Sequence, residues 1–437
     1  MNLVRRVASF GRLVLALAKS PALRDDLKHI IERPPLPTPA SVGGDAIDVR
    51  TLIDRFSVEE LATAADEYFL HNGGADRYAA MPLDDTATAP ELLIGFSQIV
   101  AGLHAPRGSA ILDFGAGTCW STRMLAQMGY AVTAVDVSSA ALEIGRELLG
   151  RLPIAGPHVS PSFLVFDGHR LDLPDASVDY VVCLNAFHHV PNPAEVLAEL
   201  FRVLRPGGIA GFSEPGEGHS HGHQAQYEMR TYAVIENDIV IDDIERWAIA
   251  AGFSGLKLAV FDSRPYLIDW REYQGLLAGG VAALKYGDFV RQAASSRRAF
   301  FLYKEGTVVP DSRDRRGLNG ILRVTIASTV TEPGGVFTGD AEVTNTGASV
   351  WLPSDAPFGA VRIGVHLFDR SGTLLDLDFA RVHLPRGMSP GQSVRFGFTT
   401  PAPPAGQFRL GFDLVSEQVC WFETNGSEVA LVDVTVA

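Results

Sequence analysis

The sequence predicts an α/β domain with a doubly wound parallel sheet, followed by a C-terminal all-β domain. Three observations support this class: apolar runs alternate with helical patterns over residues 110–303, a glycine turn follows the first run, and short alternating stretches with many prolines begin near residue 320. A chain of 437 residues is long enough for two such domains.

The first 40 residues are expected to form an amphipathic helix and a spacer. Apolar side chains between Leu3 and Leu17 share one helical face, and Pro34–Pro39 is an extended proline-rich segment. Basic residues interrupt the apolar stretch, so it is not expected to span a bilayer. Two interpretations stand: the helix docks on the protein or a partner, or residues 1–19 contact an anionic membrane surface.

The α/β domain is expected over residues 41–310 and begins with helices. Ser57 and Glu60 form a capping box, which starts a helix that runs to Phe69. Ala89–Leu103 is a further helix that leads to the first strand. These helices form an N-terminal cap ahead of the sheet.

One stretch organises this domain. Ile111–Phe114 is apolar, as expected of a strand buried on both faces, and Gly115 and Gly117 follow it at a sharp turn. A helical pattern over Ser121–Met128 leads to a second apolar strand that ends in Asp136. Strand, glycine turn, helix, strand and terminal acid form half of a nucleotide-binding unit, in which the acid accepts hydrogen bonds from ribose hydroxyls.

The motif departs from the dinucleotide fingerprint. Cys119 and Trp120 occupy the place of its third glycine, and Asp113 would repel a phosphate but suits a ligand that carries an ammonium group. The pattern apolar-apolar-Asp-x-Gly-x-Gly resembles the first motif of class I S-adenosylmethionine-dependent methyltransferases of the type 11 kind. Residues 166–168, 171–182, 185–190 and 203–208 resemble that family's later segments in the family's order. The resemblance implies a methyltransferase with a seven-stranded Rossmann-like sheet.

The remaining strands of the sheet are read from apolar runs between helical patterns. We expect them at Ala110–Phe114, Ala131–Asp136, Ser162–Asp167, Val178–Leu184, Ile209–Glu214, Leu256–Phe261 and Ala299–Tyr303. Residues 268–294 form an insertion with helical character and a break at Gly279-Gly280. Because ligands bind at the carboxyl ends of such strands, the loops there should meet in one cleft.

Residues 321–437 are expected to form a β-sandwich of immunoglobulin-like size. Val361–Phe368, Ser393–Thr399, Phe408–Leu414 and Glu428–Val436 alternate in character, and residues 369–372 form a turn. The domain resembles β-sandwich modules appended to bacterial polysaccharide-assembly proteins. Trp351 and Trp421 are expected in its core, with stacking on sugars as the alternative.

The resemblance assigns the cofactor, S-adenosyl-L-methionine, to the glycine loop and the neighbouring strand ends. Asp113 would lie near the methionine ammonium, Asp136 would bind the ribose, and Asp167 would accept from the adenine amino group. The implied cofactor-binding residues are Asp113, Phe114, Gly115, Ala116, Gly117, Asp136, Val137, Asp167, Gly168, Asn185 and Ala186.

Histidines are the candidate catalytic residues, since methyl transfer to a hydroxyl needs a group that takes its proton. His188 and His189 follow the fourth strand, although many enzymes of the resembling family do not use such a pair as a base. His219 and His221 alternate with His223 in a glycine-rich loop. That loop is a polar loop, a source of a base or a substrate contact, or a divalent metal site; we expect no resident metal.

The acceptor side is expected to include residues after the fifth strand and one from the N-terminal helices: Glu214, Glu217, Tyr227, Arg230 and Tyr68. Glu228, Tyr232 and Glu236 continue the same segment. Tyr68 and Tyr78 are lid residues if the helices cover the cofactor as in the resembling family, or half-buried packing otherwise.

The charge and the cysteines restrict the functional class. With 37 basic and 51 acidic residues, the net charge of −14 argues against a general nucleic-acid binder. Three scattered cysteines fit a cytoplasmic protein. The appended module favours O-methylation of a sugar or glycan precursor. The alternatives are a small-molecule or lipid-linked phenol as acceptor, or a non-catalytic glycan-binding or assembly protein on a methyltransferase scaffold.

Overall fold

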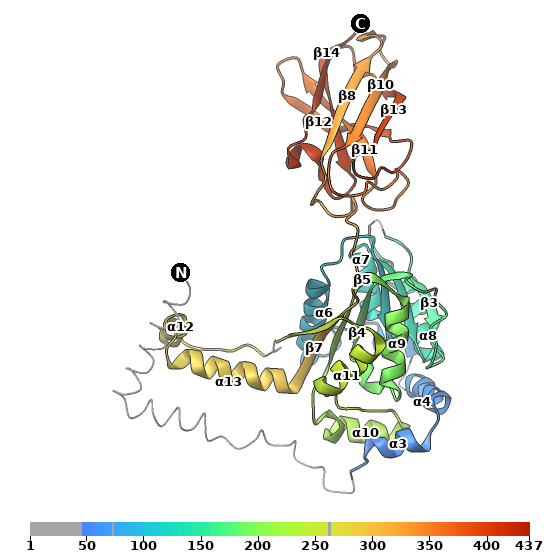
Figure 1. Ribbon diagram of the computed structural model, residues 1–437, viewed down its shortest axis with the longest axis vertical. Coiled ribbons are helices and arrows are strands. Elements are labelled where there is room, and N and C mark those ends of the chain that lie inside the picture. Colours follow the sequence, from blue (N-terminus) through green and yellow to red (C-terminus); the bar gives the residue numbers. More distant parts are fainter. Residues whose placement is uncertain (1–45, 72–73, 157, 261–263) are drawn as a thin grey trace.

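The computed structural model describes residues 46–71, 74–156, 158–260 and 264–437 (Figure 1). The amphipathic helix and spacer expected over residues 1–40 lie outside these described residues. An α/β domain and an all-β domain follow each other along the chain, as the sequence predicts. Among the described residues, no helix is both long and apolar enough to cross a membrane.

The α/β domain is built on a seven-stranded sheet with the order β3-β2-β1-β4-β5-β7-β6. Its strands are β1 (Ala110–Phe114), β2 (Ala131–Asp136), β3 (Ser162–Val165), β4 (Val178–Leu184), β5 (Leu204–Pro215), β6 (Gly255–Ala259) and β7 (Arg297–Tyr303). The expectation of an all-parallel sheet is wrong for β7, which pairs antiparallel with both β5 and β6. The chain returns after β6 to fill the gap between these two strands, and this return reverses the direction of β7.

Helices cover both faces of the sheet and its carboxyl edge. They are α3 (Val49–Arg55), α4 (Val58–His71), α5 (Gly74–Tyr78), α6 (Ala89–Leu103), α7 (Trp120–Gln127), α8 (Ser139–Arg151), α9 (Pro193–Val203), α10 (His223–Tyr232) and α11 (Ile241–Ala251), with short 3₁₀ turns η1 (Phe187–His189) and η2 (His219–His221). Apolar residues of α9 and α11 pack with β1, β4 and β5 in one core, whereas α6 and α7 pack in another. The doubly wound arrangement is therefore present.

The start of α4 has the predicted capping box. The Ser57 N–H donates to Glu60 Oε2 at 2.8 Å, and the Glu60 N–H donates to Ser57 Oγ at 3.2 Å. Two backbone donors that helix geometry leaves unpaired are thus satisfied. The predicted bounds of α6 and of β1, β2 and β4 agree with the structure, while β3 ends two residues earlier than predicted and β5 begins five residues earlier.

The predicted insertion is a helical arm of α12 (Trp270–Leu277) and α13 (Val281–Ser296), with its break at Gly279 and Gly280. Figure 1 shows the arm extending sideways from the sheet. Leu267, Trp270 and Leu277 are 85%, 68% and 71% exposed there. No residue of α12 or α13 lines the cavity that is described below.

The C-terminal domain consists of two sheets that face each other. One has the order β13-β10-β8 and the other β12-β11-β14-β16-β9, with β15 paired to β14. The strands are β8 (Gly320–Ile326), β9 (Val330–Thr331), β10 (Val336–Asn345), β11 (Val361–Asp369), β12 (Leu374–His383), β13 (Ser393–Pro401), β14 (Gly406–Ser416), β15 (Cys420–Trp421) and β16 (Ala430–Val436). Trp351 is fully buried in the core against Phe422, as predicted, whereas Trp421 is half-buried.

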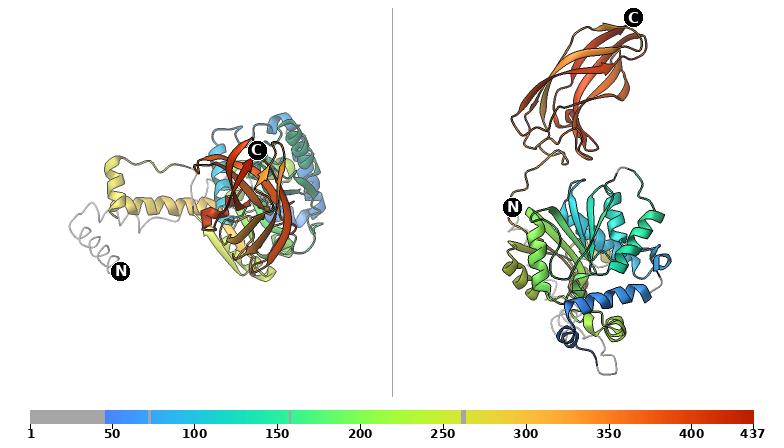
Figure 2. Two further views of the ribbon diagram at one scale, coloured as in Figure 1. Left: turned by 90° about the horizontal axis from the view of Figure 1, so that it is seen from above. Right: turned by 90° about the vertical axis from the view of Figure 1, so that its right-hand side faces the viewer.

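The two domains meet at the amino-terminal edge of the α/β sheet (Figure 2). Arg313 of the connector donates to the Gly108 carbonyl, just before β1, at 2.9 Å. The Arg107 guanidinium lies 5.1 Å from the centre of the Phe358 ring. The β-sandwich is thus attached to the end of the sheet opposite the one where ligands bind in such folds.

Candidate functional site

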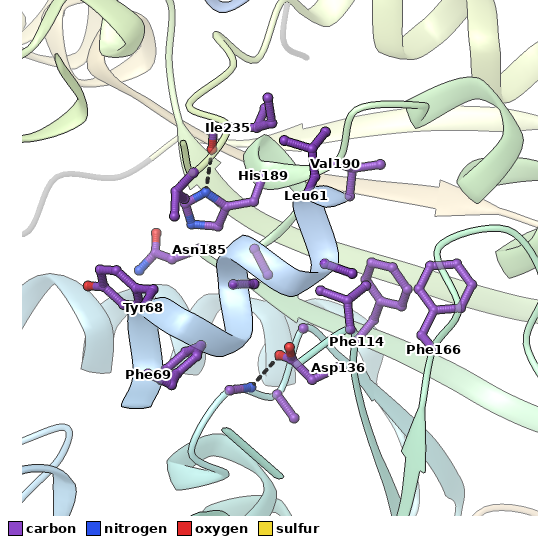
Figure 3. Close-up of a pocket in the computed structure, with 18 of the residues that line it drawn as sticks. Leu61, Tyr68, Phe69, Phe114, Asp136, Phe166, Asn185, His189, Val190 and Ile235 are labelled. Carbon is purple, nitrogen blue, oxygen red and sulfur yellow. Dashed lines mark hydrogen bonds between the residues drawn. The ribbon is translucent and has the colours of Figure 1, made fainter. Parts of the chain in front are cut away.

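A cavity of about 360 Å³ lies at the carboxyl ends of the central strands. Its floor comes from the loops after β1, β2 and β4, and α4 and the segment before α6 supply the opposite wall. Figure 3 shows Leu61, Tyr68 and Phe69 on α4, with Asp136 and His189 lying toward opposite sides of that helix. The volume is within the usual range for small-molecule sites.

The glycine loop provides bare backbone at the cavity floor. Gly115 adopts a φ of +70°, and a Cβ there would lie 2.1 Å from the Cβ of Ala186. Gly168 adopts a φ of +91°, and a Cβ there would meet Val58 of α4 at 2.2 Å. Both positions therefore require glycine, which keeps the loop, the β4 end and α4 close around the cavity.

Asp136 is placed where the predicted ribose-binding acid is needed. It lines the cavity, and its two carboxylate oxygens accept from the Gly117 N–H and the Ser138 N–H, both at 2.8 Å. Burial raises its pKa, although these two hydrogen bonds oppose the shift. Each oxygen keeps a second lone pair, so the carboxylate can also accept from the hydroxyls of a bound ribose.

Asp66 connects α4 to this same corner of the site. Its Oδ1 accepts from the Ser138 hydroxyl at 2.7 Å and from the Ala140 N–H at 2.9 Å. The helix that closes the cavity is thereby bound to the start of α8, two residues beyond the ribose-binding acid. The sequence reasoning did not identify Asp66, and no motif marks it.

Asp113 does not line the cavity, contrary to its predicted place beside the methionine ammonium. It is 1% exposed, and its Oδ2 accepts from the hydroxyls of Ser121 and Thr122 at 2.8 and 2.6 Å. Burial raises its pKa to about 6. Asp113 lies below the glycine loop because side chains alternate along β1, and it holds the first turn of α7.

Asp167 is also absent from the cavity wall. It is exposed and accepts from the backbone N–H groups of His169 and Arg170 at 2.7 and 2.6 Å. The neighbouring Gly168 does line the cavity. Asp167 stands outside the wall because β3 ends before it and the chain turns, and its contact with the adenine amino group stays a prediction.

The other predicted cofactor residues do meet at the cavity: Phe114, Gly115, Ala116, Gly117, Val137, Gly168, Asn185 and Ala186. Asn185 has a φ of +50°, and its Oδ1 accepts from Arg297 at 2.5 Å. Arg297 pairs with Glu91 of α6 at 2.5 Å as well. Sequence reasoning missed this arginine because it stands at the start of β7, more than a hundred residues away.

His188 and Glu214 lie behind the cavity wall rather than on it. The His188 Nδ1–H donates to Glu214 at 2.6 Å, and Glu214 also accepts from the N–H groups of Ala186 and Phe187 at 3.0 and 3.1 Å. Burial lowers the pKa of His188 to about 4, so the imidazole is neutral. Neither residue lines the cavity, where their predicted roles as base and substrate contact would have placed them.

His189 is the predicted catalytic histidine that does line the cavity. Its Nδ1–H donates to the Ile235 carbonyl at 2.6 Å (Figure 3). Burial opposes protonation, but the charge of Glu236 and the carbonyl outweigh it and raise the pKa of His189. His219 does not line the cavity; its Nε2–H donates to Glu236 Oε2 at 2.7 Å.

Four residues expected at the acceptor side face solvent instead: His221, Glu217, Tyr227 and Arg230. Glu217 pairs with Arg298 at 3.0 Å. The loop after β5 turns outward before α10, and these side chains turn away with it. Tyr68 does line the cavity, with its ring edge-on to Phe69 and Tyr232, and burial raises the pKa of its hydroxyl.

The remaining cavity wall is mostly apolar and aromatic. It includes Phe69, Tyr78, Met81, Leu92, Trp120, Val234, Ile235 and Glu228. Helical periodicity pointed to burial of several of these side chains, but nothing in the sequence distinguished burial in a core from exposure to a cavity. Glu228 was expected near the acceptor, and it is there.

Comparisons with known proteins find a likeness over the segment that contains the glycine loop and Asp136. Residues 112–212 match the family model described as a methyltransferase domain. The chain is 37% identical over 105 residues to a 2-methyl-6-phytyl-1,4-hydroquinone methyltransferase of Synechocystis, and 32% identical over 142 residues to a demethylmenaquinone methyltransferase of Renibacterium salmoninarum. These matches cover 24% and 32% of this chain, but only 31% and 56% of the two relatives.

A solved structure of Haemonchus contortus phosphoethanolamine N-methyltransferase 2 in complex with S-adenosyl-L-methionine is 18% identical, with a TM-score of 0.37. The likeness covers 60% of this chain and 61% of that chain. A similarity of this degree carries no functional argument. What the family match shows is a Rossmann-like methyltransferase domain with a mixed sheet; the polysaccharide-assembly likeness of the β-sandwich stays a prediction.

Proposed function

We propose that this protein is an S-adenosylmethionine-dependent methyltransferase that acts on a hydroxyl group. One observation carries the proposal: a glycine loop and the acid at the end of the next strand line one cavity, within the segment that matches a methyltransferase domain. The likeness covers only part of the chain and of its relatives, so the activity of the whole protein is our inference.

The cavity residues fit the cofactor along its length. Asp136 would accept from the ribose hydroxyls, and Val137 and Gly168 would flank the adenine. Gly115 and Gly117 would lie against the methionine portion, where the absence of side chains leaves room. The cofactor, when bound, supplies a methyl group activated by a positively charged sulfur.

The acceptor would enter between α4 and the Val234–Ile235 segment. The side chains there are aromatic or apolar, apart from His189 and Glu228. Such a wall favours a planar or lipid-like acceptor with few polar groups, and the names of two relatives mention a phytyl hydroquinone and a demethylmenaquinone. The phenol acceptor, an alternative from the sequence, is therefore our first proposal.

The sugar acceptor that the sequence favoured depended on the appended β-sandwich. That domain contacts the opposite edge of the sheet and adds no residue to the cavity wall. Few polar side chains are available to bind several sugar hydroxyls. We therefore keep the sugar as the second acceptor class to be tested.

The reaction is a direct displacement. The acceptor oxygen forms a bond to the methyl carbon, the carbon–sulfur bond breaks, and its electron pair remains on sulfur. The hydroxyl proton leaves toward the end of the cavity that holds His189 and Glu228. The chain's main contribution is to align oxygen, methyl and sulfur and to exclude water.

The experiment is a methyl-transfer assay with S-adenosylmethionine labelled on the methyl group. Isothermal titration with S-adenosylmethionine and S-adenosylhomocysteine comes first, and binding of neither would overturn the proposal. A panel of hydroquinones, simple phenols and sugars is then assayed in parallel. We expect label in a phenolic product; label only in a sugar would favour the second acceptor class.

A further inference from the structure

Several ionisable side chains converge behind the acceptor end of the cavity. One ring nitrogen each of His188 and His189 and one carboxylate oxygen of Glu236 lie within 4.8 Å of one another. The ring centres of His188 and His189 are 3.9 Å apart, and the His219 ring centre is 5.0 Å from that of His188. Glu236 is only 2% exposed. Its charge therefore has to be balanced inside the protein.

Hydrogen bonds around the cluster already orient its members. Because the Nδ1–H of His188 donates to Glu214, its Nε2 is left with a free lone pair that lies 3.6 Å from Glu236. His219 holds Oε2 of Glu236 at 2.7 Å, whereas Oε1 is buried with no hydrogen-bond partner among the described residues. Histidine and carboxylate ligands of metal ions are typically held by such hydrogen bonds, here from His188 to Glu214 and from His219 to Glu236.

The separations within the cluster suit a cation better than direct hydrogen bonds. Nε2 of His188 lies 3.6 Å from Oε2 of Glu236, and Nδ1 of His189 lies 3.6 Å from its Oε1; both distances are too long for a hydrogen bond. Ligands around a tetrahedral ion with bonds of roughly 2.1 Å are about 3.4 Å apart. The distance of each nitrogen from the Glu236 carboxylate is thus close to that between two ligands of one ion.

The local charge balance points the same way. In the part of the chain that the structure describes, the ion pairs of Glu214 and Glu236 involve histidines alone, and Glu228 forms no ion pair. With neutral imidazoles, Glu214 is stabilised by hydrogen bonds from His188 and the backbone, and Glu236 by the one from His219, but neither buried carboxylate meets an opposite charge. A protonated histidine or a metal ion would each supply that charge.

We propose that His188, His189 and Glu236 bind one divalent transition-metal ion, with Zn²⁺ as the best match to two imidazoles and a carboxylate. To bind the ion, Nδ1 of His189 gives up its hydrogen bond to the Ile235 carbonyl. Three protein ligands leave a fourth position open, as in catalytic rather than structural sites. Of the three ligands, His189 also lines the cavity, so the proposed site lies next to the cavity wall. If the proposed function holds, the acceptor oxygen occupies that position and loses its proton more readily.

The test measures metal binding without reference to turnover. The full chain, free of any affinity tag, is stripped with a chelator, dialysed against Co²⁺ or Zn²⁺, and its metal content is determined by atomic emission. We expect one ion per chain, release of a proton on binding, and visible absorption bands of Co²⁺ with nitrogen ligands. Binding of less than 0.2 ion per chain would overturn the proposal in favour of protonated histidines.

Variants locate the site. Glu236→Gln and His188→Asn should each weaken metal binding at least tenfold, while His221→Gln, on the neighbouring 3₁₀ turn but facing solvent, should retain it. His366→Gln controls for a second group in the β-sandwich, His366 with Asp413 and Glu423, whose ligand atoms also lie within 4.8 Å. Loss of the ion in either control, or its retention in Glu236→Gln, would overturn the assignment.

Titration with S-adenosylhomocysteine shows whether each variant is folded, since that ligand is expected to use other residues of the cavity. A variant that loses the ion and still binds S-adenosylhomocysteine supports the site. If Glu236→Gln binds neither the metal ion nor S-adenosylhomocysteine, the experiment is repeated with Glu236→Asp. Its side chain is one methylene shorter, so an unchanged metal affinity would count against the proposal. A chain that binds the ion but transfers no methyl group would leave the site in place and overturn only the proposed function.

Discussion

The α/β domain and the β-sandwich bury their polar groups in different ways. In the described part of the α/β domain, the carboxylates of Asp113, Glu214 and Glu236 are buried beside or behind a cavity. The sandwich surrounds Trp351 with apolar side chains, and its buried Asp413 accepts from two backbone N–H groups. The first domain gives up stability to hold charges near a ligand, whereas the second is organised for packing.

The positions of the two domains sharpen this difference. The cavity opens at the carboxyl edge of the sheet, and the sandwich contacts the amino edge through Arg313 and Phe358. Loss of one domain's core should therefore leave the other domain's function intact. The predictions below test this independence, beginning with the largest expected effect.

The largest effect is expected from Trp351→Ala. Removing this fully buried ring should lower the free energy of unfolding of the sandwich by about 3–5 kcal/mol. Urea denaturation followed by intrinsic fluorescence would measure the loss, and titration with S-adenosylhomocysteine would show unchanged affinity. A parallel loss of ligand affinity would mean that the two domains are coupled after all.

Asp136→Ala should weaken ligand binding and leave the stability of the β-sandwich unchanged. We expect affinity for S-adenosylhomocysteine to fall about 100-fold, or roughly 2.7 kcal/mol, because the ribose loses its acceptor and the Gly117 N–H loses its partner. Calorimetric titration measures this. Asp172→Ala, an exposed acid of the same domain, is the matched control and should bind normally. Normal binding by the Asp136 variant would remove the main support for the proposed function.

Asp113→Asn should make the α/β domain more stable at alkaline pH. Burial raises the folded-state pKa of Asp113 from 3.8 to about 6, so the folded protein disfavours the ionised form. The carboxyl therefore loses its contribution to stability as the pH rises from about 4 through 6. Asparagine carries no charge, so the variant should gain roughly 1–3 kcal/mol at pH 8 and nothing below pH 4.

Denaturation curves across this pH range measure the gain. The sandwich transition serves as the internal control, since Asp113 belongs to the other domain. A constant difference between variant and parent at every pH would show that the charge of Asp113 does not matter.

Ser57→Ala should give the smallest effect. The cap of α4 is exposed, and its loss should cost about 1 kcal/mol of helix stability. Because α4 forms one wall of the cavity, we expect S-adenosylhomocysteine affinity to fall a few-fold with no change in the sandwich. Thr63→Ala, also on α4 but away from its start, is the control.

Local sequence signals predicted the backbone of the site more successfully than its side chains. The glycine turn and the apolar runs placed β1, β2 and Asp136 correctly, because these depend on short-range geometry. The family resemblance assigned Asp113 and Asp167 to the cofactor, but neither lines the cavity, because their surroundings depend on which face a strand presents and on where β3 ends.

Long-range features were the hardest to predict. The sequence predicted the same possible roles for the histidines of the loop after β5. Of these, His219 turns inward, because it donates a hydrogen bond to Glu236 on a later segment. The strands β8, β10 and β12 were not among the predicted ranges, although buried and exposed residues largely alternate along β8 and β10. Arg297 reaches Asn185 only through the antiparallel insertion of β7.

The bonds that Asp66 makes to Ser138 and Ala140 have a kinetic consequence. The helix over the cavity is fastened next to the acid expected to hold the nucleoside, so the spent cofactor cannot leave until that fastening opens. Turnover would then be limited by departure of the demethylated product rather than by the chemistry. A burst of product in the first cycle, lost when Asp66 is replaced by alanine, would be its signature.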